Sequence, residues 1–273
     1  MILDGKKLRD ELLVSYKEKI SKNNLSITLA IILVGDDEAS KLYIKNKEKY
    51  CSMVGINVIK YLLPKETSEE GLMTLIKKLN EKEEVTGIIL QSPVPSNIDF
   101  DKCSGLIKAS KDVDGFTKEN VYNLYLNKKS ILPCTVKGII RLLDSYNILL
   151  RGKDVVIIGR GNIVGKPLAM ALENRNATVS LLHSKTKDII KYTKNADIVV
   201  SACGVPKLLK RDMIKQGAVV IDVGISRTDT GIIGDIDFES IKDVASYVTP
   251  NPGGVGPMTV AMIIDNLIEM SEV

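Results

Sequence analysis

The chain has 273 residues, with 38 basic and 34 acidic side chains and a formal net charge of +4. This length allows two domains or one large α/β unit, and a mild charge without an arginine-rich arm argues against a nucleic-acid partner. The apolar runs are far shorter than the roughly 18 residues that span a bilayer, and the first residues do not read as a signal peptide. We therefore expect no membrane partner.

The cysteines and the single histidine say which covalent and metal chemistry to expect. The four cysteines (Cys51, Cys103, Cys134 and Cys203) are widely scattered, and none forms a Cys-x-x-Cys pair. This pattern is typical of reduced thiols in a cytoplasmic protein. With one histidine, His183, and no cluster of ligand residues, the sequence predicts no metal site.

Apolar strand patterns alternate with amphipathic helical stretches along the whole chain, which is typical of a parallel α/β fold. In the first half we predict strands near Ile27–Val34, Ile56–Leu63 and Gly87–Gln91. In the second half we predict strands near Val155–Ile158, Thr178–Leu182, Ile198–Ser201, Val219–Asp222 and Tyr247–Thr249.

A helix that begins at Asp36 or Asp37 and ends by Gly55 carries the first candidate for chemistry. Tyr43 and Lys47 are four residues apart and share one face of this helix, so the pair can hold an aromatic substrate and present an amine to it. The alternative is that Lys47 is a solvated lysine like the other lysines of this helix.

Two further segments place polar side chains at strand ends or in turns. Gln91 ends an apolar strand, at the edge where α/β proteins bind ligands, although its amide could equally be satisfied by the proline-rich turn that follows. The loop 111–116 offers two carboxylates, and Asp114 could accept hydrogen bonds from the N–H groups of a heterocycle. The alternative is that this loop is simply a turn.

The segment 154–167 predicts a strand, a tight glycine turn and a helix start marked by Pro167. This arrangement offers backbone N–H groups to a pyrophosphate. Gly159 and Gly161 would let the backbone turn and approach the ligand, and Gly165 would let the helix pack closely on the strand. An ordinary glycine-rich loop remains the alternative, since the third glycine comes one residue later than in the usual dinucleotide motif.

The residues after the next strand indicate which dinucleotide is bound. NAD sites carry an acidic residue about 20 positions beyond the glycines, but no carboxylate lies between Glu173 and Asp188. Arg160 lies within the glycine turn, and Ser184 and Lys185 stand where the acid would be. Because cationic and hydroxyl groups suit a 2′-phosphate, we expect the cofactor to be NADP. Ser184 could also be a helix N-cap.

The glycine turn opens the second set of strands, so we predict that the first 130 or so residues form a separate substrate domain. A Pro/Gly-rich loop, residues 249–259, precedes a last helix at about Pro257–Met270, which would return to the first domain. The predicted domains are therefore 1–136 with 257–273, an α/β substrate and catalytic domain, and 137–256, a Rossmann-type parallel-sheet domain for NADP.

Taken together, these segments resemble the bifunctional methylenetetrahydrofolate dehydrogenase/methenyltetrahydrofolate cyclohydrolase family, often called FolD. The matching blocks occur in the family's order and span nearly the whole chain. They are Ser40-x-x-Tyr43-x-x-x-Lys47, Gly87-Ile-Ile-Leu-Gln91-x-Pro93-x-Pro95, Lys111-Asp-Val-Asp-Gly115, Pro133-Cys-Thr135-x-Lys-Gly138, Gly159-Arg-x-Asn-Ile-Val-Gly-Lys-Pro167, His183-Ser-Lys-Thr186, Asp222-Val-Gly-Ile225, Gly234-Asp235 and Pro252-Gly-Gly-Val-Gly-Pro-Met-Thr259.

The resemblance implies a homodimer that oxidises 5,10-methylenetetrahydrofolate with NADP⁺ and then hydrolyses the methenyl product to 10-formyltetrahydrofolate. It implies that Lys47 is the general base of the hydrolysis, that Gln91 orients Lys47, that Tyr43 packs on the folate and that Asp114 binds the pterin. The Gly253–Gly254 loop would lie beside the substrate. The implied cofactor-binding residues are Thr135, Gly159, Arg160, Gly161, Ile163, Ser184 and Ile225.

Four positions depart from the family pattern: Ser92 replaces Leu, Val136 replaces Pro, Gly161 replaces Ser and Asn251 replaces Val. None of these changes removes an implied catalytic group. Two other functions remain open from the sequence: an NADP-dependent dehydrogenase that acts on another pterin or lacks the hydrolytic step, and a non-enzymatic NADP sensor. The separate set of substrate-side residues argues against a sensor.

Overall fold

The computed structural model describes residues 1–228 and 231–272, which fall into two compact units. We call residues 10–134 and 260–273 the three-strand unit, and residues 1–9 and 135–259 the five-strand unit. Each is described by itself. Helices α1 (Gly5–Lys22), α6 (Cys134–Ser145) and α10 (Val255–Ser271) span the boundaries in sequence between them.

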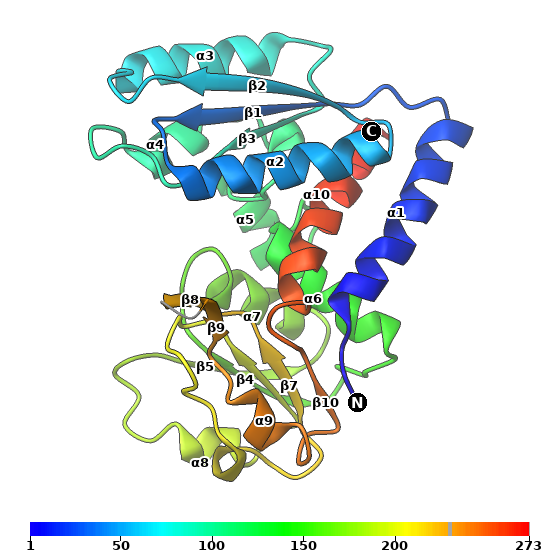
Figure 1. The fold of residues 1–273 in the computed structure, drawn as a ribbon, viewed down its shortest axis with the longest axis vertical. Coiled ribbons are helices and arrows are strands. Elements are labelled where there is room, and N and C mark those ends of the chain that lie inside the picture. The colour runs from blue at the N-terminus through cyan, green and yellow to red at the C-terminus, as the bar shows by residue number, and fades with distance from the viewer. Residues whose placement is uncertain (229–230, 273) are drawn as a thin grey trace. The chain divides into compact units, whose positions relative to one another are not determined.

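The sheet of the three-strand unit is entirely parallel, in the order β2-β1-β3. Its strands are β1 (Thr28–Val34), β2 (Asn57–Leu63) and β3 (Gly87–Leu90). Every residue of the central strand β1 is buried, whereas β2 alternates between exposed and half-buried positions as an edge strand does. The helices are α2 (Glu38–Met53) and α3 (Glu69–Glu81), which lie beside the sheet in Figure 1, then α4 (Phe100–Ser104), α5 (Lys118–Tyr125) and a 3₁₀ turn, Ala109–Lys111.

The sheet of the five-strand unit is also parallel, in the order β10-β7-β6-β4-β5. Its strands are β4 (Asp154–Ile158), β5 (Thr178–Leu182), β6 (Ile198–Ser201), β7 (Val219–Asp222) and β10 (Tyr247–Val248). Its helices are α7 (Gly165–Glu173), α8 (Ile190–Thr193) and α9 (Phe238–Ile241), with a 3₁₀ turn at Arg211–Met213. The first residues of the chain join this unit, since Ile2 forms a parallel bridge to Val248 beside β10 (Figure 1).

Each unit has its own apolar core. In the three-strand unit Ile32, Ile76 and Ile88 are among the buried side chains between the sheet and α3. In the five-strand unit Val156, Val199 and Val220 come from three neighbouring strands and are equally buried. Since each core closes within its own unit, each sheet can form a stable platform for the polar groups at its edges.

The eight predicted parallel strands are confirmed, each within one residue of its expected limits at both ends. Helix α2 begins at Glu38 with Asp37 as its N-cap, as expected. Helix α7 begins at Gly165, two residues before Pro167, so the proline lies inside the first turn rather than at its start. An antiparallel hairpin, β8 (Ile225–Thr228) with β9 (Gly231–Gly234), was not predicted.

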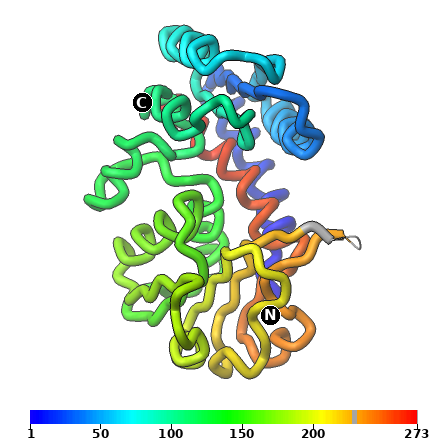
Figure 2. Tube along the Cα trace, turned by 90° about the vertical axis from the view of Figure 1, so that its left-hand side faces the viewer, coloured from blue at the N-terminus to red at the C-terminus, as the bar shows by residue number. Residues whose placement is uncertain are grey.

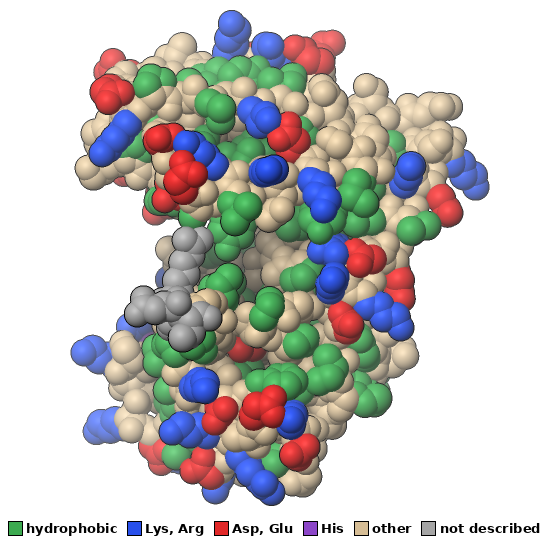
Figure 3. Space-filling model, in the orientation of Figure 1, with side chains coloured by type: hydrophobic (Ala, Val, Ile, Leu, Met, Phe, Trp, Pro, Cys, Tyr) green, Lys and Arg blue, Asp and Glu red, His purple; other side chains and the backbone are tan. Residues whose placement is uncertain are grey.

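The chain trace in Figure 2 follows the five-strand unit from green through yellow to orange, with the hairpin at one side of it. Side chains of both charges are intermixed over the face shown in Figure 3. Within the described ranges no helix is long and apolar enough to cross a membrane. No group of three or more His, Cys, Asp and Glu side chains that could hold a metal ion occurs in residues 1–228 and 231–272.

Candidate active site

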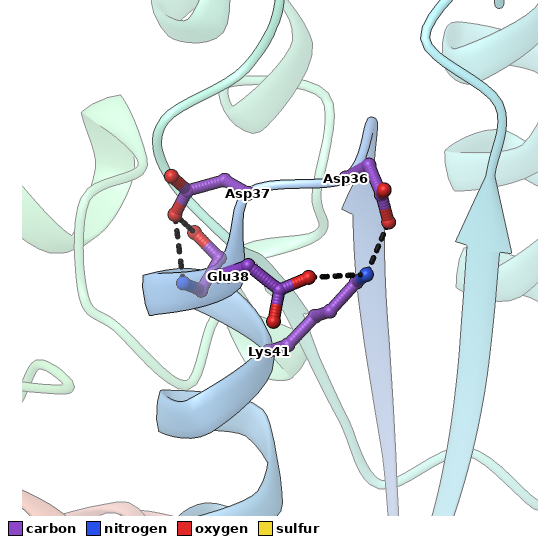
Figure 4. A network of polar contacts seen from close by, with 5 residues as sticks. Asp36, Asp37, Glu38 and Lys41 are labelled. Carbon is purple, nitrogen blue, oxygen red and sulfur yellow. Dashed lines mark hydrogen bonds and ion pairs between the residues drawn. The ribbon is translucent and has the colours of Figure 1, made fainter.

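The start of helix α2 is fixed by its own polar residues. The Asp37 carboxylate accepts hydrogen bonds from the backbone N–H of Ser40 at 2.7 Å and from its hydroxyl at 2.8 Å (Figure 4). On the outer side Lys41 pairs with Asp36 and Glu38, and these hydrogen bonds, with Asp36 first, raise the pKa of Lys41. Lys41 is therefore a surface ion-pair lysine rather than a candidate for chemistry.

Lys47 has a different environment from the other lysines of α2. It is half-buried, whereas Lys41, Lys45 and Lys49 are exposed. Its Nζ donates a hydrogen bond of 3.0 Å to Oε1 of Gln91, directly after strand β3. The Gln91 amide in turn donates to the carbonyl of Ser92 at 2.8 Å. Gln91 is thus satisfied by the turn, as the alternative proposed, and also binds Lys47.

Tyr43 and Cys51 lie one turn from Lys47 on either side of it in α2. Tyr43 is about half exposed, at 49%. Cys51 is buried, and this burial raises the pKa of its thiol to about 12, although the charge of Lys47 acts in the opposite direction. The thiol is therefore neutral near neutral pH, and Cys51 contributes no charge beside Lys47.

The two carboxylates of the loop 111–116 have separate functions. Asp112 is buried and accepts hydrogen bonds from the backbone N–H groups of Gly115 (2.9 Å) and Thr117 (2.7 Å) and from the Asn120 amide (3.1 Å). It therefore shapes the turn. Asp114 is half-buried and accepts no hydrogen bond from any described residue. Burial raises its pKa, the positive charge of Lys47 lowers it, and Asp112 raises it further.

A pocket of about 680 Å³ lies within the five-strand unit, at the carboxyl ends of β4, β5 and β6. These ends flank the point where the strand order reverses, which is where open parallel sheets bind ligands. The described residues that line the pocket include no Asp or Glu. They are Ile158, Gly159, Arg160, Gly161, His183, Ser184, Thr186, Lys187, Ile189, Ala202, Cys203, Val205 and Leu208.

The three glycines of the turn differ in their structural roles. Gly159 has φ +115°, and a Cβ there would lie 2.3 Å from the carbonyl oxygen of Ala202. A Cβ on Gly165 would lie 1.9 Å from the carbonyl oxygen of Gly159, so α7 does pack directly on the turn. A Cβ on Gly161 would meet nothing within 4 Å, and its φ is not positive. The expectation that a glycine at 161 lets the backbone turn sharply is therefore wrong, because this φ is open to other residues and a side chain fits there; its approach to the cofactor stays a prediction.

The loop after β5 is closed by its own hydrogen bonds. Thr186 Oγ1 accepts from the backbone N–H of His183 at 3.0 Å, and His183 Nδ1 accepts from the N–H of Lys185 at 3.2 Å. The next helix, α8, begins only at Ile190, so Ser184 is not its N-cap. Ser184 and Lys187 line the pocket, whereas Lys185 does not.

The pocket does not include every expected cofactor residue. Ile163 and Ile225 are exposed, at 57% and 48%, and neither lines it. Thr135 lies in the first turn of α6, where its hydroxyl forms a 3.1 Å hydrogen bond with that of Thr259.

In the loop before α10, the Gly253 carbonyl accepts a hydrogen bond from the N–H of Lys6 at 2.9 Å, and a Cβ on Gly5 would lie 1.9 Å from the Gly254 oxygen.

Two buried carboxylates of the five-strand unit, Asp222 and Asp235, lie side by side, a pairing that the sequence analysis did not predict although both residues belong to its family blocks. Asp222 Oδ1 accepts from the N–H of Asp235 at 2.9 Å. Oδ2 of Asp235 accepts from the hydroxyl of Ser201 and the N–H of Cys203, both at 2.9 Å, and from the N–H of Gly204 at 3.2 Å. The other oxygen, Oδ1, has no partner among the described residues. A signal was present, since Asp222 ends an apolar strand, but its partner is 13 residues away.

Burial raises the pKa of Asp222 to about 6, and the negative charge of Asp235 adds to the rise. Hydrogen bonds from the backbone of Asp235 and Ile236 and from the side chain of Asn251 act in the opposite direction. The hydrogen bonds of Asp222 and Asp235 link the end of β7 to the end of β6 and to Cys203, which lines the pocket.

Comparison with known proteins places this geometry in a family. A family model described as "Tetrahydrofolate dehydrogenase/cyclohydrolase, catalytic domain" matches residues 3–114, and its "NAD(P)-binding domain" counterpart matches residues 133–273. The chain is 50% identical over 274 residues to "Bifunctional protein FolD" of Aquifex aeolicus, covering 98% of this chain and 94% of that protein.

Two solved structures extend the comparison. The bifunctional FolD enzyme of Campylobacter jejuni is 45% identical, with a TM-score of 0.98 over 100% of this chain and 98% of the other. The Trypanosoma brucei FolD, solved with NADP and an inhibitor, is 34% identical, with a TM-score of 0.94 over 100% and 97% of the two chains. The family resemblance and the fold class expected from the sequence are thereby confirmed, and the chain belongs to the tetrahydrofolate dehydrogenase/cyclohydrolase (FolD) family.

Proposed function

We propose that this protein oxidises 5,10-methylenetetrahydrofolate to 5,10-methenyltetrahydrofolate with NADP⁺ and then hydrolyses the product to 10-formyltetrahydrofolate. Membership in a bifunctional dehydrogenase/cyclohydrolase family supports both activities. The observation that carries the proposal is the half-buried Lys47, which is bonded to Gln91 and interacts electrostatically with Asp114. The same chain has a nucleotide pocket whose described lining residues include no carboxylate.

The nucleotide pocket fits NADP⁺ by its charge. Arg160 and Ser184 offer a guanidinium and a hydroxyl to a 2′-phosphate, and a carboxylate at this place would repel that group. The backbone of Gly159 and the start of α7 offer N–H groups to the pyrophosphate. We propose further cofactor contacts at Gly161, Thr135, Ile163 and Ile225.

In the first reaction NADP⁺ accepts a hydride at C4 of its nicotinamide ring from the one-carbon bridge of the folate. The resulting methenyl cation is stabilised by the two nitrogen atoms that flank the carbon, so the protein need not supply a charge for it. The protein's task is to hold the reacting atoms in line and close together. We propose that the ring of Tyr43 packs on the folate and that the Gly253–Gly254 loop lies beside it.

In the second reaction we propose Lys47 as the general base. Deprotonated Lys47 takes a proton from water as the water oxygen bonds to the methenyl carbon. The carbon–N5 bond then breaks as the new hydroxyl gives up its proton and N5 takes one up, which leaves a formyl group on N10 and releases one proton overall. Gln91 Oε1, 3.0 Å from Lys47 Nζ, fixes the direction of the amine.

Asp114 is proposed to bind the pterin ring. Its carboxylate has no hydrogen bond from described residues, so both oxygens can accept from the N–H groups of the ring. The cost of burying an unpaired carboxylate, visible in the raised pKa of Asp114, would fall when such a ligand binds. The homodimer and the cytoplasmic location implied by the family remain part of this proposal, and sedimentation of the purified protein would test the dimer.

The proposal is tested by following cofactor reduction and methenyltetrahydrofolate absorbance together, starting from methylenetetrahydrofolate with NADP⁺ or NAD⁺. We expect faster reduction of NADP⁺ and little methenyl accumulation. Methenyl that accumulates to its uncatalysed level would remove the cyclohydrolase step. Absence of reduction with both cofactors would overturn the proposed reaction.

A further inference from the structure

The nucleotide pocket at the carboxyl ends of β4, β5 and β6 is lined by a lysine as well as by Arg160. Arg160 belongs to the glycine turn after β4, and Lys187 belongs to the loop after β5. We propose that Lys187 binds the 2′-phosphate of NADP⁺ together with Arg160 and is a second residue that determines specificity for NADP⁺ over NAD⁺. This inference rests on the proposed use of NADP⁺, and it gives Lys187 the place that spacing along the sequence suggested for Lys185.

The loop after β5 separates its two lysines. The N–H of Thr186 donates to the carbonyl of His183 at 2.8 Å, so Ser184 and Lys185 are the two central residues of a tight turn. The Thr186 hydroxyl and the His183 ring close the same turn with their own hydrogen bonds. Both Lys185 and Lys187 are exposed, but only Lys187 lines the pocket.

The backbone of Lys187 is also fixed on its other side. The carboxylate of Asp188 accepts hydrogen bonds from the backbone N–H groups of Ile190 at 3.1 Å and Lys191 at 3.3 Å, at the start of α8. Asp188 is therefore bound to this helix, and it does not line the pocket. Lys187 thus lies between a closed turn and a capped helix, so its side chain extends from a well-anchored position.

The two cations of the pocket are available to a ligand. Arg160 and Lys187 form no hydrogen bond or ion pair with any residue that the structure describes. By contrast, Lys166 near the same glycine turn donates to Oδ1 of Asn162 at 2.9 Å and does not line the pocket. Since the described lining residues include no Asp or Glu, the pocket has an excess of positive charge that favours an anionic group.

The position of Lys187 favours the 2′-phosphate over the pyrophosphate. The pyrophosphate belongs at the glycine turn and the start of α7, which follow β4. The adenosine ribose belongs at the end of the next strand, where NAD enzymes carry their acidic residue, and Lys187 is in the loop that leaves this end of β5. A phosphate monoester carries about −1.5 to −2 charges near neutral pH, so one guanidinium does not neutralise it and a second cation adds to binding.

The test measures binding rather than turnover, by calorimetric titration of the protein with two fragments of the cofactor. Adenosine 2′,5′-bisphosphate contains the 2′-phosphate, and adenosine 5′-monophosphate lacks it. Lys187→Met keeps most of the side chain but removes the ammonium group. We expect it to weaken binding of the bisphosphate roughly 5- to 20-fold, between the effects of an exposed ion pair and of a strong charged hydrogen bond. Binding of the monophosphate should change less than about twofold.

Two further variants separate a phosphate contact from a general change of charge. Lys185→Met is the matched control, because it removes the same charge from an exposed side chain of the same loop that does not line the pocket. It should bind both fragments within about twofold of the wild type. Lys187→Arg keeps the charge, and its affinity for the bisphosphate should stay within about threefold of the wild type.

Steady-state kinetics and salt dependence add two independent readouts. In Lys187→Met the KM for NADP⁺ should rise by the same factor as the dissociation constant of the bisphosphate, with kcat nearly unchanged, because the 2′-phosphate takes no part in hydride transfer. The KM for NAD⁺ should stay the same within about twofold. The advantage of the wild type over Lys187→Met should shrink as salt is added, since salt screens exposed charges.

Each outcome decides the inference. An unchanged affinity of a folded Lys187→Met for the bisphosphate would overturn it, and so would equal losses for both fragments or an equal loss in Lys185→Met. A wild-type protein that does not prefer the bisphosphate to the monophosphate would overturn it together with the use of NADP⁺. A wild-type protein that prefers the bisphosphate but reduces no cofactor would overturn the proposed reaction alone, and the variants would still decide whether Lys187 binds the phosphate.

Discussion

The carboxylates of Asp222 and Asp235 in the five-strand unit and that of Asp114 in the three-strand unit differ in their hydrogen-bond partners. In the five-strand unit Asp222 and Asp235 accept hydrogen bonds from the backbone of Asp235, Cys203 and Gly204 and from the Ser201 hydroxyl. In the three-strand unit the carboxylate of Asp114 accepts none from the described residues, and Lys47 has a single amide partner. Carboxylates bonded to several backbone groups fix a fold, whereas a half-buried one without partners has acceptors left for a ligand.

The largest expected effect concerns Lys47, which lies with Gln91 and Asp114 in the three-strand unit. Lys47→Met keeps most of the length of the side chain but removes the amine, so cyclohydrolase activity should fall on the order of 100- to 10,000-fold. Hydride transfer to NADP⁺ should persist at least in part, because that step needs no proton from Lys47. Both rates should be measured separately, with methenyltetrahydrofolate and with methylenetetrahydrofolate as substrates.

The matched control for this variant is Lys45→Met, since Lys45 lies in the same helix but is exposed. We expect Lys45→Met to retain both activities. Full cyclohydrolase activity in Lys47→Met would remove Lys47 from the mechanism and would make its bond to Gln91 a structural contact.

The nucleotide pocket of the five-strand unit allows a second, smaller test. Arg160→Ala removes the guanidinium that is proposed to bind the 2′-phosphate, a bond worth about 1.5–3 kcal/mol. The ratio of kcat/KM for NADP⁺ to that for NAD⁺ should therefore fall roughly 10- to 100-fold. Steady-state kinetics with both cofactors checks this, and an equal loss with NADP⁺ and NAD⁺ would contradict a phosphate contact.

The local features of this chain were the most predictable from its sequence. The period of apolar residues placed the parallel strands, and the N-cap at Asp37 follows from residues only three positions apart. The residues that meet at the nucleotide pocket follow from one rule, since ends of neighbouring parallel strands share an edge. The domain limits and the roles of the site residues remain predictions.

Other features depend on contacts between distant residues, which no local pattern encodes. The strands of the hairpin, Ile-Ser-Arg-Thr and Gly-Ile-Ile-Gly, lack the longer apolar run that marks buried strands of the same length such as β6. Asn266, fully buried in α10, donates to the carbonyls of Val113 and Leu132, more than 130 residues away. Likewise, spacing nominated both Asp112 and Asp114, and only the fold shows that Asp112 is used by the turn.

Asp112 and Asp114 lie in one loop, so they allow a direct comparison of a hydrogen-bonded carboxylate with one that has no such bond. Asp112→Asn weakens the bonds to the N–H groups of Gly115 and Thr117, so it should lower the free energy of unfolding by about 1–3 kcal/mol. Asp114→Asn should leave stability nearly unchanged, because burial already disfavours the charged form, but should raise the KM for folate. Urea unfolding and steady-state kinetics of both variants would measure this.

Equal destabilisation by the two substitutions would contradict the assignment of Asp112 to the fold and Asp114 to the ligand. A loss of folate affinity in Asp112→Asn that is not accompanied by a loss of stability would contradict it as well.

The smallest expected effect concerns the stability cost of the buried Asp222 carboxylate in the five-strand unit. Burial raises the pKa of Asp222 to about 6 from an ordinary value of 3.8, so the folded protein holds this proton more tightly than the unfolded chain. The stability that this proton contributes is complete below pH 3.8 and is lost as the pH rises through 6.

The amide introduced by Asp222→Asn has no such proton to lose, so the variant should gain roughly 1 kcal/mol relative to the wild type between pH 5 and pH 7. Thermal unfolding of both proteins across this range would show the difference in Tm rising with pH, because the contributions of groups that do not interact with Asp222 cancel. A difference in Tm that is constant or falls with pH would contradict this expectation. It would mean that the hydrogen bonds from Asp235, Ile236 and Asn251 outweigh the burial of Asp222 and stabilise its charged form.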